Sequence, residues 1–446
     1  MARLHQSLIC FIILCLSLSA CGGRAKLDVA EGMGPAPTLP PPEKALIPVI
    51  KISPAAGWPP GATPVAAPGL RVAAFATGLD HPRWMTLLPN GDVLVAETNG
   101  PVRPKDGRGI KGFFFRLFQK KAGSGVPSAN RITLLRDADG DGVAETRATF
   151  LSGLNSPFGM TLVGDTLYVA DTDAVLAFLY HSGETSIAAA PRRLVDLPAG
   201  EINHHWSKNL IASRDGRHLF VTTGSNSNVG ENGLAAEEGR AAIWLVDLRD
   251  GSHSLYATGL RNPNGLAFEP RSGALWTTVN ERDELGSDLV PDYMTHVEQG
   301  AFYGWPFSYF GNHVDDRIKP DERRPDLVAR AVVPDYALGP HTASLGLAFA
   351  AGARLGPRFA EGAFVGQHGS WNRVPQSGYK VIFVPFSAGR PAGPAVDVLT
   401  GFIDARDRAQ GRPVGVVLDK TGSLLVADDV GNTVWRVSAA SAVAAR

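Results

Sequence analysis

Cysteine is scarce in this 446-residue chain, and it is confined to the N-terminus. The three cysteines, Cys10, Cys15 and Cys21, all lie within the first 21 residues. The rest of the chain therefore has no disulfide, no cysteine nucleophile and no thiolate metal site. The chain also has no net charge, because 43 Lys and Arg balance 43 Asp and Glu. Since no basic stripe interleaved with aromatics is present either, nothing in the sequence points to a nucleic-acid partner.

The apolar run near the N-terminus is shorter than a typical transmembrane helix. Arg3 precedes an apolar run from Leu8 to Ala20, which is typical of a secretory signal. The run ends in Leu18–Gly22, which resembles a bacterial lipobox with Cys21 as the lipidated residue. The alternative is an ordinary signal peptide that ends near a cysteine. We expect residues 1–21 to direct export and Cys21 to anchor the protein in a membrane, facing the periplasm or the cell exterior.

Residues 22–68 lack any regular apolar pattern and are rich in proline. Proline removes backbone donors and favours extended, semi-rigid chain, so we expect this segment to be a tether between the anchor and a folded domain. The prolines are Pro35, Pro37, Pro40, Pro41, Pro42, Pro48, Pro54, Pro59, Pro60, Pro64 and Pro68.

Sustained helical periodicity is absent from residues 69–440, and a repeated pattern takes its place. With 50 glycines and 33 prolines, the composition favours short strands and tight turns. A turn, an apolar strand, a Gly-containing turn and a second apolar strand recur six times at roughly 50- to 85-residue intervals, as in propellers with loop insertions. We therefore predict an all-β, six-bladed β-propeller with four-stranded blades around a central channel. The six repeats begin near Gly78, Gly153, His205, Gly259, His341 and Gly411.

Four motifs in order resemble one known family. They are Asn203–Leu210, Gly259–Gly265, Asn280–Gly286 with Tyr303–Pro306, and His368–Arg373. Together they resemble the glucose/sorbosone dehydrogenase family, especially its sorbosone dehydrogenase-like branch, from about Leu70 to Val437. The resemblance implies a six-bladed propeller that holds pyrroloquinoline quinone (PQQ) over a calcium ion at the channel mouth. It also implies oxidation of sugars or related polyols and aldehydes.

Arginines stand at matching turns before three of the repeats, and PQQ carries three carboxylates. Arg binds carboxylates in a planar, two-pronged manner better than Lys does. The resemblance assigns Arg261 and Asn262 to the quinone edge and Arg412 to a carboxylate, and the equivalent place of Arg83 adds that residue. The alternative is that each arginine pairs with a neighbouring aspartate.

Histidines provide the candidate base. By resemblance His205 is the general base, and an imidazole with an ordinary pKa near 6.5 suits removal of a hydroxyl proton. His204 is its competitor, and we expect a strand here to send only one of the two toward the channel. The acidic residue that orients the family's base is replaced by Ser225. His368 lies near the place of a PQQ-contacting lysine and is a candidate for PQQ or substrate binding.

Two segments could bind calcium, which prefers hard oxygen ligands. The loop with Arg282 and Asp283 matches the family's calcium loop, which binds partly through backbone carbonyls. Separately, Asp137, Asp139 and Asp141 resemble the first half of an EF-hand loop. Position 12 of that loop is Ala148 instead of Glu, so the full signature fails. A plain acidic turn is the alternative.

Two other functions compete with PQQ-dependent oxidation. A calcium-dependent propeller lactonase would need one metal on carboxylates and Asn, but no carboxylate-binding arginines. A non-catalytic surface propeller would show no quinone affinity. For the dehydrogenase, the expected partners are a small sugar or aldehyde and an electron acceptor, a quinone or a cytochrome, with the membrane reached through the lipid anchor.

Overall fold

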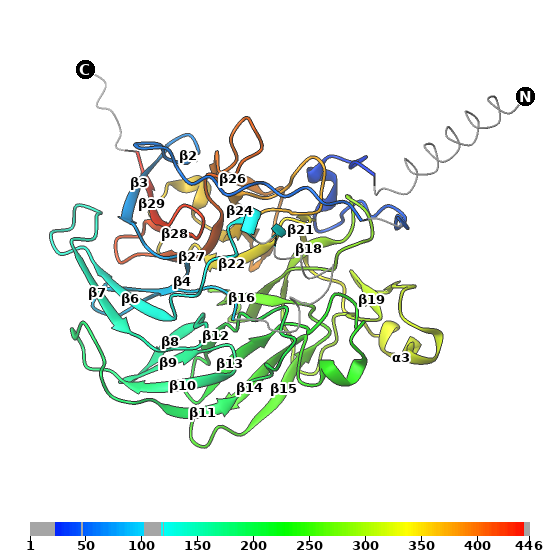
Figure 1. The fold of residues 1–446 in the computed structure, drawn as a ribbon, viewed down its shortest axis with the longest axis horizontal. Coiled ribbons are helices and arrows are strands. Elements are labelled where there is room, and N and C mark those ends of the chain that lie inside the picture. Colours follow the sequence, from blue (N-terminus) through cyan, green and yellow to red (C-terminus); the bar gives the residue numbers. More distant parts are fainter. Residues whose placement is uncertain (1–22, 46–47, 102–116, 119, 441–446) are drawn as a thin grey trace, which may run out of the picture.

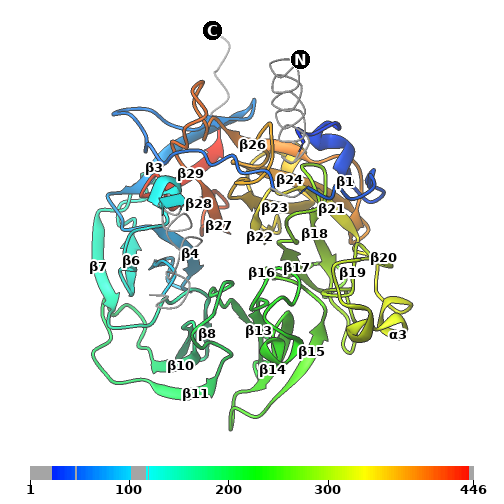
Figure 2. The same cartoon turned by 45° about the vertical axis from the view of Figure 1, so that its right-hand side comes forward.

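The computed structural model describes residues 23–45, 48–101, 117–118 and 120–440. Within these residues the strands form six blades of four strands, which follow one another in chain order around a central axis (Figures 1 and 2). The predicted six-bladed β-propeller is confirmed. The cysteines Cys10, Cys15 and Cys21 lie outside the described residues.

Each blade runs from an inner strand at the axis to an outer strand at the rim, with antiparallel neighbours. Blade one has β4 (Pro82–Leu87), β5 (Val93–Glu97), β6 (Arg131–Arg136) and β7 (Thr146–Leu151). Blade two has β8 (Met160–Val163), β9 (Thr166–Ala170), β10 (Ala174–Leu179) and β11 (Arg192–Asp196). Blade three has β12 (Leu210–Ala212), β13 (His218–Thr223), β14 (Ala242–Asp247) and β15 (His253–Thr258).

The second half of the ring carries the additions to the basic blade. Blade four has β16 (Pro263–Phe268), β17 (Leu275–Val279), β18 (Pro291–His296), β21 (Tyr336–Pro340) and the short β1 (Met33–Gly34). Blade five has β22 (Ser344–Phe349), β23 (Gly362–Gln367), β24 (Lys380–Ser387), β26 (Val396–Thr400) and the short β2 (Val65–Ala66), with β25 (Arg390–Pro391) beside β24. Blade six has β27 (Pro413–Leu418), β28 (Leu424–Asp428), β29 (Thr433–Ala439) and β3 (Leu70–Thr77).

The remaining elements are short and lie between or beside the blades. The hairpin β19 (Ser308–Tyr309) and β20 (His313–Val314) precedes η3 (Pro320–Glu322) and α3 (Pro325–Val328) in an insertion of blade four. The other 3-10 turns are η1 (Val29–Gly32), η2 (Leu234–Glu237) and η4 (Pro357–Phe359). None of the helices in the described part of the chain is long and apolar enough to cross a membrane.

Burial follows position in the blade. Every residue of β5, β17 and β28 is buried, because both faces of a second strand pack against neighbouring blades. Glycines let the inner strands approach one another around the axis. A Cβ on Gly265 would lie 2.6 Å from the Leu345 carbonyl oxygen, and one on Gly346 only 2.2 Å from that of Val414. Glycine is therefore needed at these two positions for close packing of the inner strands at the axis.

The ring is closed by strands from the two ends of the domain. β3 pairs antiparallel with β29, from Leu70 opposite Ala439 to Thr77 opposite Thr433 (Figure 1, blue beside red). Blade six thus joins the first and last strands, which the repeat pattern did not predict.

The Pro-rich segment differs from the expected tether. It is extended, but it runs along the propeller, with β1 paired to β21 and β2 paired to β26. The Trp58 indole donates to the buried Asp428 carboxylate at 2.7 Å, and Ser53 is fully buried. Proline prevents a regular ladder but leaves single donors and acceptors able to pair with a neighbouring surface. The folded unit therefore includes much of residues 23–68.

Candidate active site at one end of the channel

The candidate residues gather at one end of the channel because of strand direction. Pro82 pairs with Glu97, Pro263 with Val279, and Pro413 with Asp428. The start of each inner strand thus lies beside the end of the second strand. Proline fits at the first residue of a strand because no ladder donor is needed there. Arg83, Arg261, Asn262 and Arg412 flank these prolines and so share one mouth.

His205 is held by the backbone and side chain of one residue. Its Nδ1 lies 2.9 Å from both the carbonyl oxygen and the Oγ of Ser225. Ser225 Oγ donates to the Ser227 carbonyl at 2.6 Å, so it accepts from His205. A carbonyl also only accepts, which assigns the imidazole proton to Nδ1 and leaves the Nε2 lone pair available. Ser225 thus holds the imidazole by hydrogen bonds, without the charge of an acidic residue.

The environment keeps His205 neutral. Burial is the main cause of a pKa well below the ordinary histidine value, and the positive charge of Arg261 lowers the pKa further. The hydrogen bond to Ser225 opposes this shift only in part. A neutral imidazole at physiological pH can accept a proton, as a general base must.

The reason given above for preferring His205 to His204 is wrong. Both residues lie in a bend before β12, so strand alternation does not separate them. The preference for His205 has a different structural basis, because this imidazole is anchored to Ser225 and lies beside Asn262. A Cβ on Gly224 would stand 2.4 Å from both His205 Cβ and Asn262 Oδ1, so only glycine allows this close approach.

Arg261 and Asn262 are neighbours at the mouth, but their polar atoms differ in how many hydrogen bonds they make. The Arg261 guanidinium donates to the Glu281 carbonyl at 2.6 Å, to Asn228 Oδ1 at 2.9 Å and to Asp283 at 3.1 Å. The alternative to ligand binding, pairing of this arginine with an aspartate, is thus observed for Arg261. In contrast, the buried Oδ1 of Asn262 has no hydrogen-bond partner among the described residues.

Asp283 and Arg282 both come from the predicted calcium loop, but their side chains bind different partners. The Asp283 carboxylate accepts from Arg261 and, at 2.8 Å, from Asn372. Burial raises its pKa, but His341, Arg261 and Asn372 outweigh that effect and hold the pKa at about 2. The Arg282 side chain is fully buried between Glu281 and Asp315, so any metal contact of this residue would come from its backbone.

We call Asp429 and its four cationic or imidazole neighbours the Asp429 cluster. The Asp429 carboxylate lies 2.8 Å from His368 Nε2, 3.2 Å from Arg83 Nη1 and 3.4 Å from His81 Nε2. Arg412, whose backbone carbonyl accepts from the Asp429 amide, completes the set. Sequence reasoning found His368, Arg83 and Arg412 but missed Asp429 and His81. The His-Pro-Arg order before β4 and the doubled Asp at the end of β28 were the available signals.

The charges of this cluster are strongly coupled. Burial lowers the pKa of His368 to about 4 although Asp429 opposes the shift. The Asp429 pKa lies far below its ordinary value, because His368, His81 and Arg83 outweigh the effect of burial. The cluster therefore holds one carboxylate against two guanidinium groups, and it is net positive at neutral pH.

Two arginines of the cluster each have one hydrogen-bond donor without an acceptor among the described residues. The Nε atoms of Arg83 and Arg412 are buried and have no hydrogen-bond partner among the described residues. Each guanidinium group lies over an aromatic ring, with Arg412 4.9 Å from the Tyr379 ring centroid and Arg83 5.6 Å from that of Trp206. An unpaired buried donor is costly, so these groups fit an anionic ligand with several carboxylates, such as PQQ. Trp206 also connects this cluster with the neighbouring His205.

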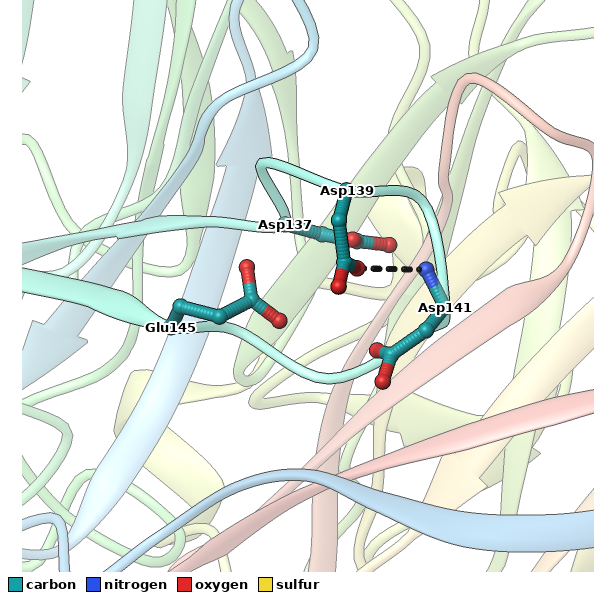
Figure 3. A group of neighbouring side chains, drawn as sticks. All are labelled: Asp137, Asp139, Asp141 and Glu145. Atoms are coloured by element: carbon teal, nitrogen blue, oxygen red, sulfur yellow. Dashed lines mark hydrogen bonds between the residues drawn. The ribbon is translucent and has the colours of Figure 1, made fainter.

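The EF-hand-like loop lies away from the mouth, between β6 and β7 (Figure 3). Ligand atoms of Asp137, Asp139, Asp141 and Glu145 lie within 4.8 Å of one another. Glu145 is a member that the sequence comparison with an EF-hand did not include. The carboxylates accept from amides of their own loop, for example Asp139 from the Asp141 amide at 3.0 Å. Their assignment to calcium stays a prediction.

A family model described as TrAA12-like matches residues 120–299 and 319–440, more than half of the chain. The chain belongs to the TrAA12-like family. A PQQ-dependent pyranose dehydrogenase of Coprinopsis cinerea is 24% identical over 427 residues, which cover 82% of this chain and 53% of that protein. The family is one of β-propellers related, at a distance, to PQQ-dependent sugar dehydrogenases.

Solved structures show the same fold at low identity. The holo PQQ domain of the Coprinopsis cinerea pyranose dehydrogenase superposes with a TM-score of 0.66 and 23% identity, covering 87% of this chain and all of that domain. A calcium structure of a Trichoderma reesei AA12 protein gives a TM-score of 0.68 at 19% identity, covering 88% of this chain and 99% of that one.

Proposed function

We propose that this protein is a PQQ- and calcium-dependent dehydrogenase of sugars or related polyols and aldehydes, with sorbosone-type aldehydes among the candidates. The observation that carries the proposal is the pairing of two features at one mouth. A partly buried, neutral histidine shares the mouth with Arg83 and Arg412, whose buried Nε atoms have no hydrogen-bond partner among the described residues. The printed functions of the relatives, a PQQ-dependent pyranose dehydrogenase and a PQQ-bound domain, support the same chemistry.

Different residues of the mouth would bind the cofactor and transfer the proton. Arg83 and Arg412 would bind cofactor carboxylates through their spare Nε donors, and Arg261 and Asn262 would orient the quinone edge. When bound, PQQ supplies the quinone carbonyl group that accepts a hydride. His205 Nε2 accepts the proton of the substrate hydroxyl, while Ser225 keeps the Nδ1 proton in place. His368, which also contacts Asp429, would bind the cofactor or the substrate.

Calcium belongs to the same proposal. The loop of Arg282 and Asp283 would supply backbone carbonyls and a carboxylate of low pKa, which is a hard-oxygen set that suits this ion. The calcium structure of the Trichoderma reesei relative supports the choice of metal. The loop of Asp137, Asp139 and Asp141 would hold a second, structural calcium.

The test is to add PQQ and Ca²⁺ to the purified protein and follow dye reduction with a panel of aldoses, polyols and aldehydes. We expect reduction that needs both additions. Hydrolysis of lactones by the calcium-loaded protein without PQQ would instead indicate the lactonase. Absence of both activities, together with no PQQ binding, would indicate a non-catalytic propeller.

We further propose that the protein is exported and anchored through a lipid on Cys21, and that a membrane quinone or a cytochrome accepts its electrons. Replacement Cys21→Ser should move the protein from the membrane fraction to the soluble one. A wild-type protein that is already soluble and whose mass shows no acyl chain would contradict the anchor.

A further inference from the structure

Lys208 is a fully buried lysine close to the proposed base, and the mechanism above gives it no role. Its exposed fraction is 0%, whereas every other lysine that the structure describes is at least partly exposed. Lysine is almost never fully buried unless an acidic group pairs with it. Here burial, helped by the positive charge of Arg240, holds the pKa of Lys208 well below the ordinary lysine value. The amine is therefore neutral at physiological pH.

The backbone of Lys208 is fixed by neighbouring blades. The Lys208 carbonyl accepts from the Gly159 amide, just before β8, at 3.0 Å. The next residue, Asn209, donates from its side chain to the Asn264 carbonyl in β16 at 2.8 Å, and from its amide to Thr222 Oγ1 at 2.9 Å. Blades two and four thus hold the start of blade three, and the side chain of Lys208 begins from a rigid position.

From this position the amine reaches back to the bend that carries the base. Lys208 Nζ donates to the His205 carbonyl at 3.2 Å. On the following residue, Thr172 Oγ1 donates to the Trp206 carbonyl at 2.8 Å. His205 and Trp206 lie outside the strands, so no sheet ladder fixes their backbone. Two side chains therefore hold two successive carbonyls of the bend in place of a ladder.

The titratable groups around Lys208 make a charged amine unfavourable. Arg240 precedes β14, and its guanidinium is held by Asn203 Oδ1 at 3.0 Å. Glu237 offsets part of the positive charge of Arg240, but no carboxylate among the described residues does the same for Lys208. His205 lies in the same segment as Lys208 and is itself neutral. A proton on Lys208 would thus place one positive charge beside another in a buried site.

We propose that Lys208 is a positioning residue for the general base, because its neutral amine holds the His205 carbonyl and so keeps the imidazole in its place at the mouth. The inference rests on the proposed role of His205 and extends it to a second residue. Burying a lysine costs stability, and such a cost is typical of residues that serve activity. Removal of the amine should therefore have opposite effects on folding and on turnover.

The first experiment measures the stability of the protein without cofactor. Lys208→Met keeps the length of the side chain and removes the amine. The folded-state pKa of Lys208 lies below the ordinary value of 10.5, so between these two values the unfolded wild type binds one proton more than the folded one. Within this range, the unfolding equilibrium constant of wild type relative to Lys208→Met should rise about tenfold for each unit of pH decrease.

Denaturant titrations of both proteins between about pH 9 and about pH 7 measure this change. Lys319→Met is the matched control, because the Lys319 side chain is 72% exposed and pairs with Glu322. Its stability relative to wild type should change little over the same range. If the difference between Lys208→Met and wild type is also independent of pH, Lys208 is an ordinary charged lysine and the neutral amine is refuted.

The second experiment observes the base directly. In protein that carries isotope-labelled histidine, the Nδ1–H resonance of His205 reports the hydrogen bond to Ser225 and is assigned by its loss in His205→Gln. We expect Lys208→Met to shift or broaden this resonance. Lys208→Gln, which keeps a neutral N–H donor, should restore it in part. A resonance that is the same in Lys208→Met and wild type would show that the amine does not position the imidazole.

Steady-state kinetics then distinguish the positioning role from the proposed function. With PQQ and Ca²⁺ present, Lys208→Met should lower kcat about 10- to 100-fold with little change in KM or PQQ affinity, because misplaced groups react slowly. Lys208→Gln should recover part of the loss. If His205→Gln keeps full turnover, the proposed base is wrong. If His205→Gln is crippled but Lys208→Met turns over normally, only the positioning role of Lys208 is wrong.

Discussion

The two sides of the channel mouth differ in how fully their polar groups are satisfied. On the His205 side, Ser225 holds the imidazole and Arg261 is surrounded by backbone and side-chain acceptors. On the Asp429 side, the Nε donors of Arg83 and Arg412 have no partner in the part of the chain that the structure describes, and two histidines share one carboxylate. A saturated network fixes geometry, whereas spare buried donors favour an incoming anion. We propose that the first side transfers the proton and orients the quinone edge, and that the second side binds the carboxylates of the cofactor.

The largest effect should follow from His205→Gln. This change removes the proton acceptor but keeps similar size, so turnover should fall about 10²- to 10⁴-fold, as for other general bases. PQQ affinity should change little, because the Asp429 side is untouched. The measurement is reduction of bound PQQ by substrate in a single turnover, with His204→Gln as the milder control. If His204→Gln is the crippled variant, the assignment of the base is off by one residue.

On the Asp429 side, Arg412→Ala should weaken PQQ binding and not the chemical step. A hydrogen bond to a charged group contributes about 1.5–3 kcal/mol, which corresponds to about 10- to 100-fold in affinity. Equilibrium titration of PQQ measures the change, with Arg249→Ala at an exposed rim position as control. The division of labour is refuted if Arg412→Ala binds PQQ normally but turns over slowly.

A smaller effect is expected from Ser225→Ala. The variant loses the Oγ acceptor but keeps the carbonyl that binds the same Nδ1 proton, so turnover should fall only about 3- to 10-fold. The pH profile of turnover checks the cause. Because the His205 pKa lies well below its ordinary value, wild-type activity should persist below pH 6.5 and fall only in more acidic buffer. A loss centred at pH 6.5 would show that the imidazole is solvated.

Stability should respond to pH through His368. Its folded-state pKa of about 4 lies below the ordinary value near 6.5, so the unfolded chain binds the proton more readily. The stability contributed by keeping this imidazole neutral is complete above pH 6.5 and is lost as the pH falls toward 4. Melting temperatures of wild type and His368→Gln should therefore converge on acidification. A constant difference across this range would contradict the pKa.

The smallest effect concerns the acidic loop at the rim. If calcium binds there, Asp139→Asn should reduce the rise in melting temperature that Ca²⁺ causes, while Asp165→Asn in another exposed turn should not. Saturation at a hundredfold excess over Kd stabilises a protein by about 2.7 kcal/mol. If both variants respond equally to Ca²⁺, the loop of Asp137, Asp139 and Asp141 is an acidic turn that does not bind calcium.

The propeller could be predicted from the sequence because the apolar runs in its repeats correspond to the buried strands of the blades. Continuous apolar runs such as Val93–Ala96 and Leu424–Ala427 form most of the fully buried second strands. The same reasoning could not place Asp429 among His81, Arg83 and His368, because these residues come from different blades and meet only when the ring closes. The contacts of Glu43, Lys51 and Ser53 with the propeller were missed for a related reason. They depend on single donors and acceptors, which leave no periodic pattern in a proline-rich segment.

The central claim is that the mouth binds PQQ through the Asp429 side with the help of calcium. The most direct measurement is equilibrium titration of PQQ into the purified protein with Ca²⁺ and, separately, with a chelator. The account predicts saturable binding of one PQQ per chain with Ca²⁺ and much weaker binding with the chelator. No saturable binding in either sample would contradict it, and equal binding in both would remove calcium from the site.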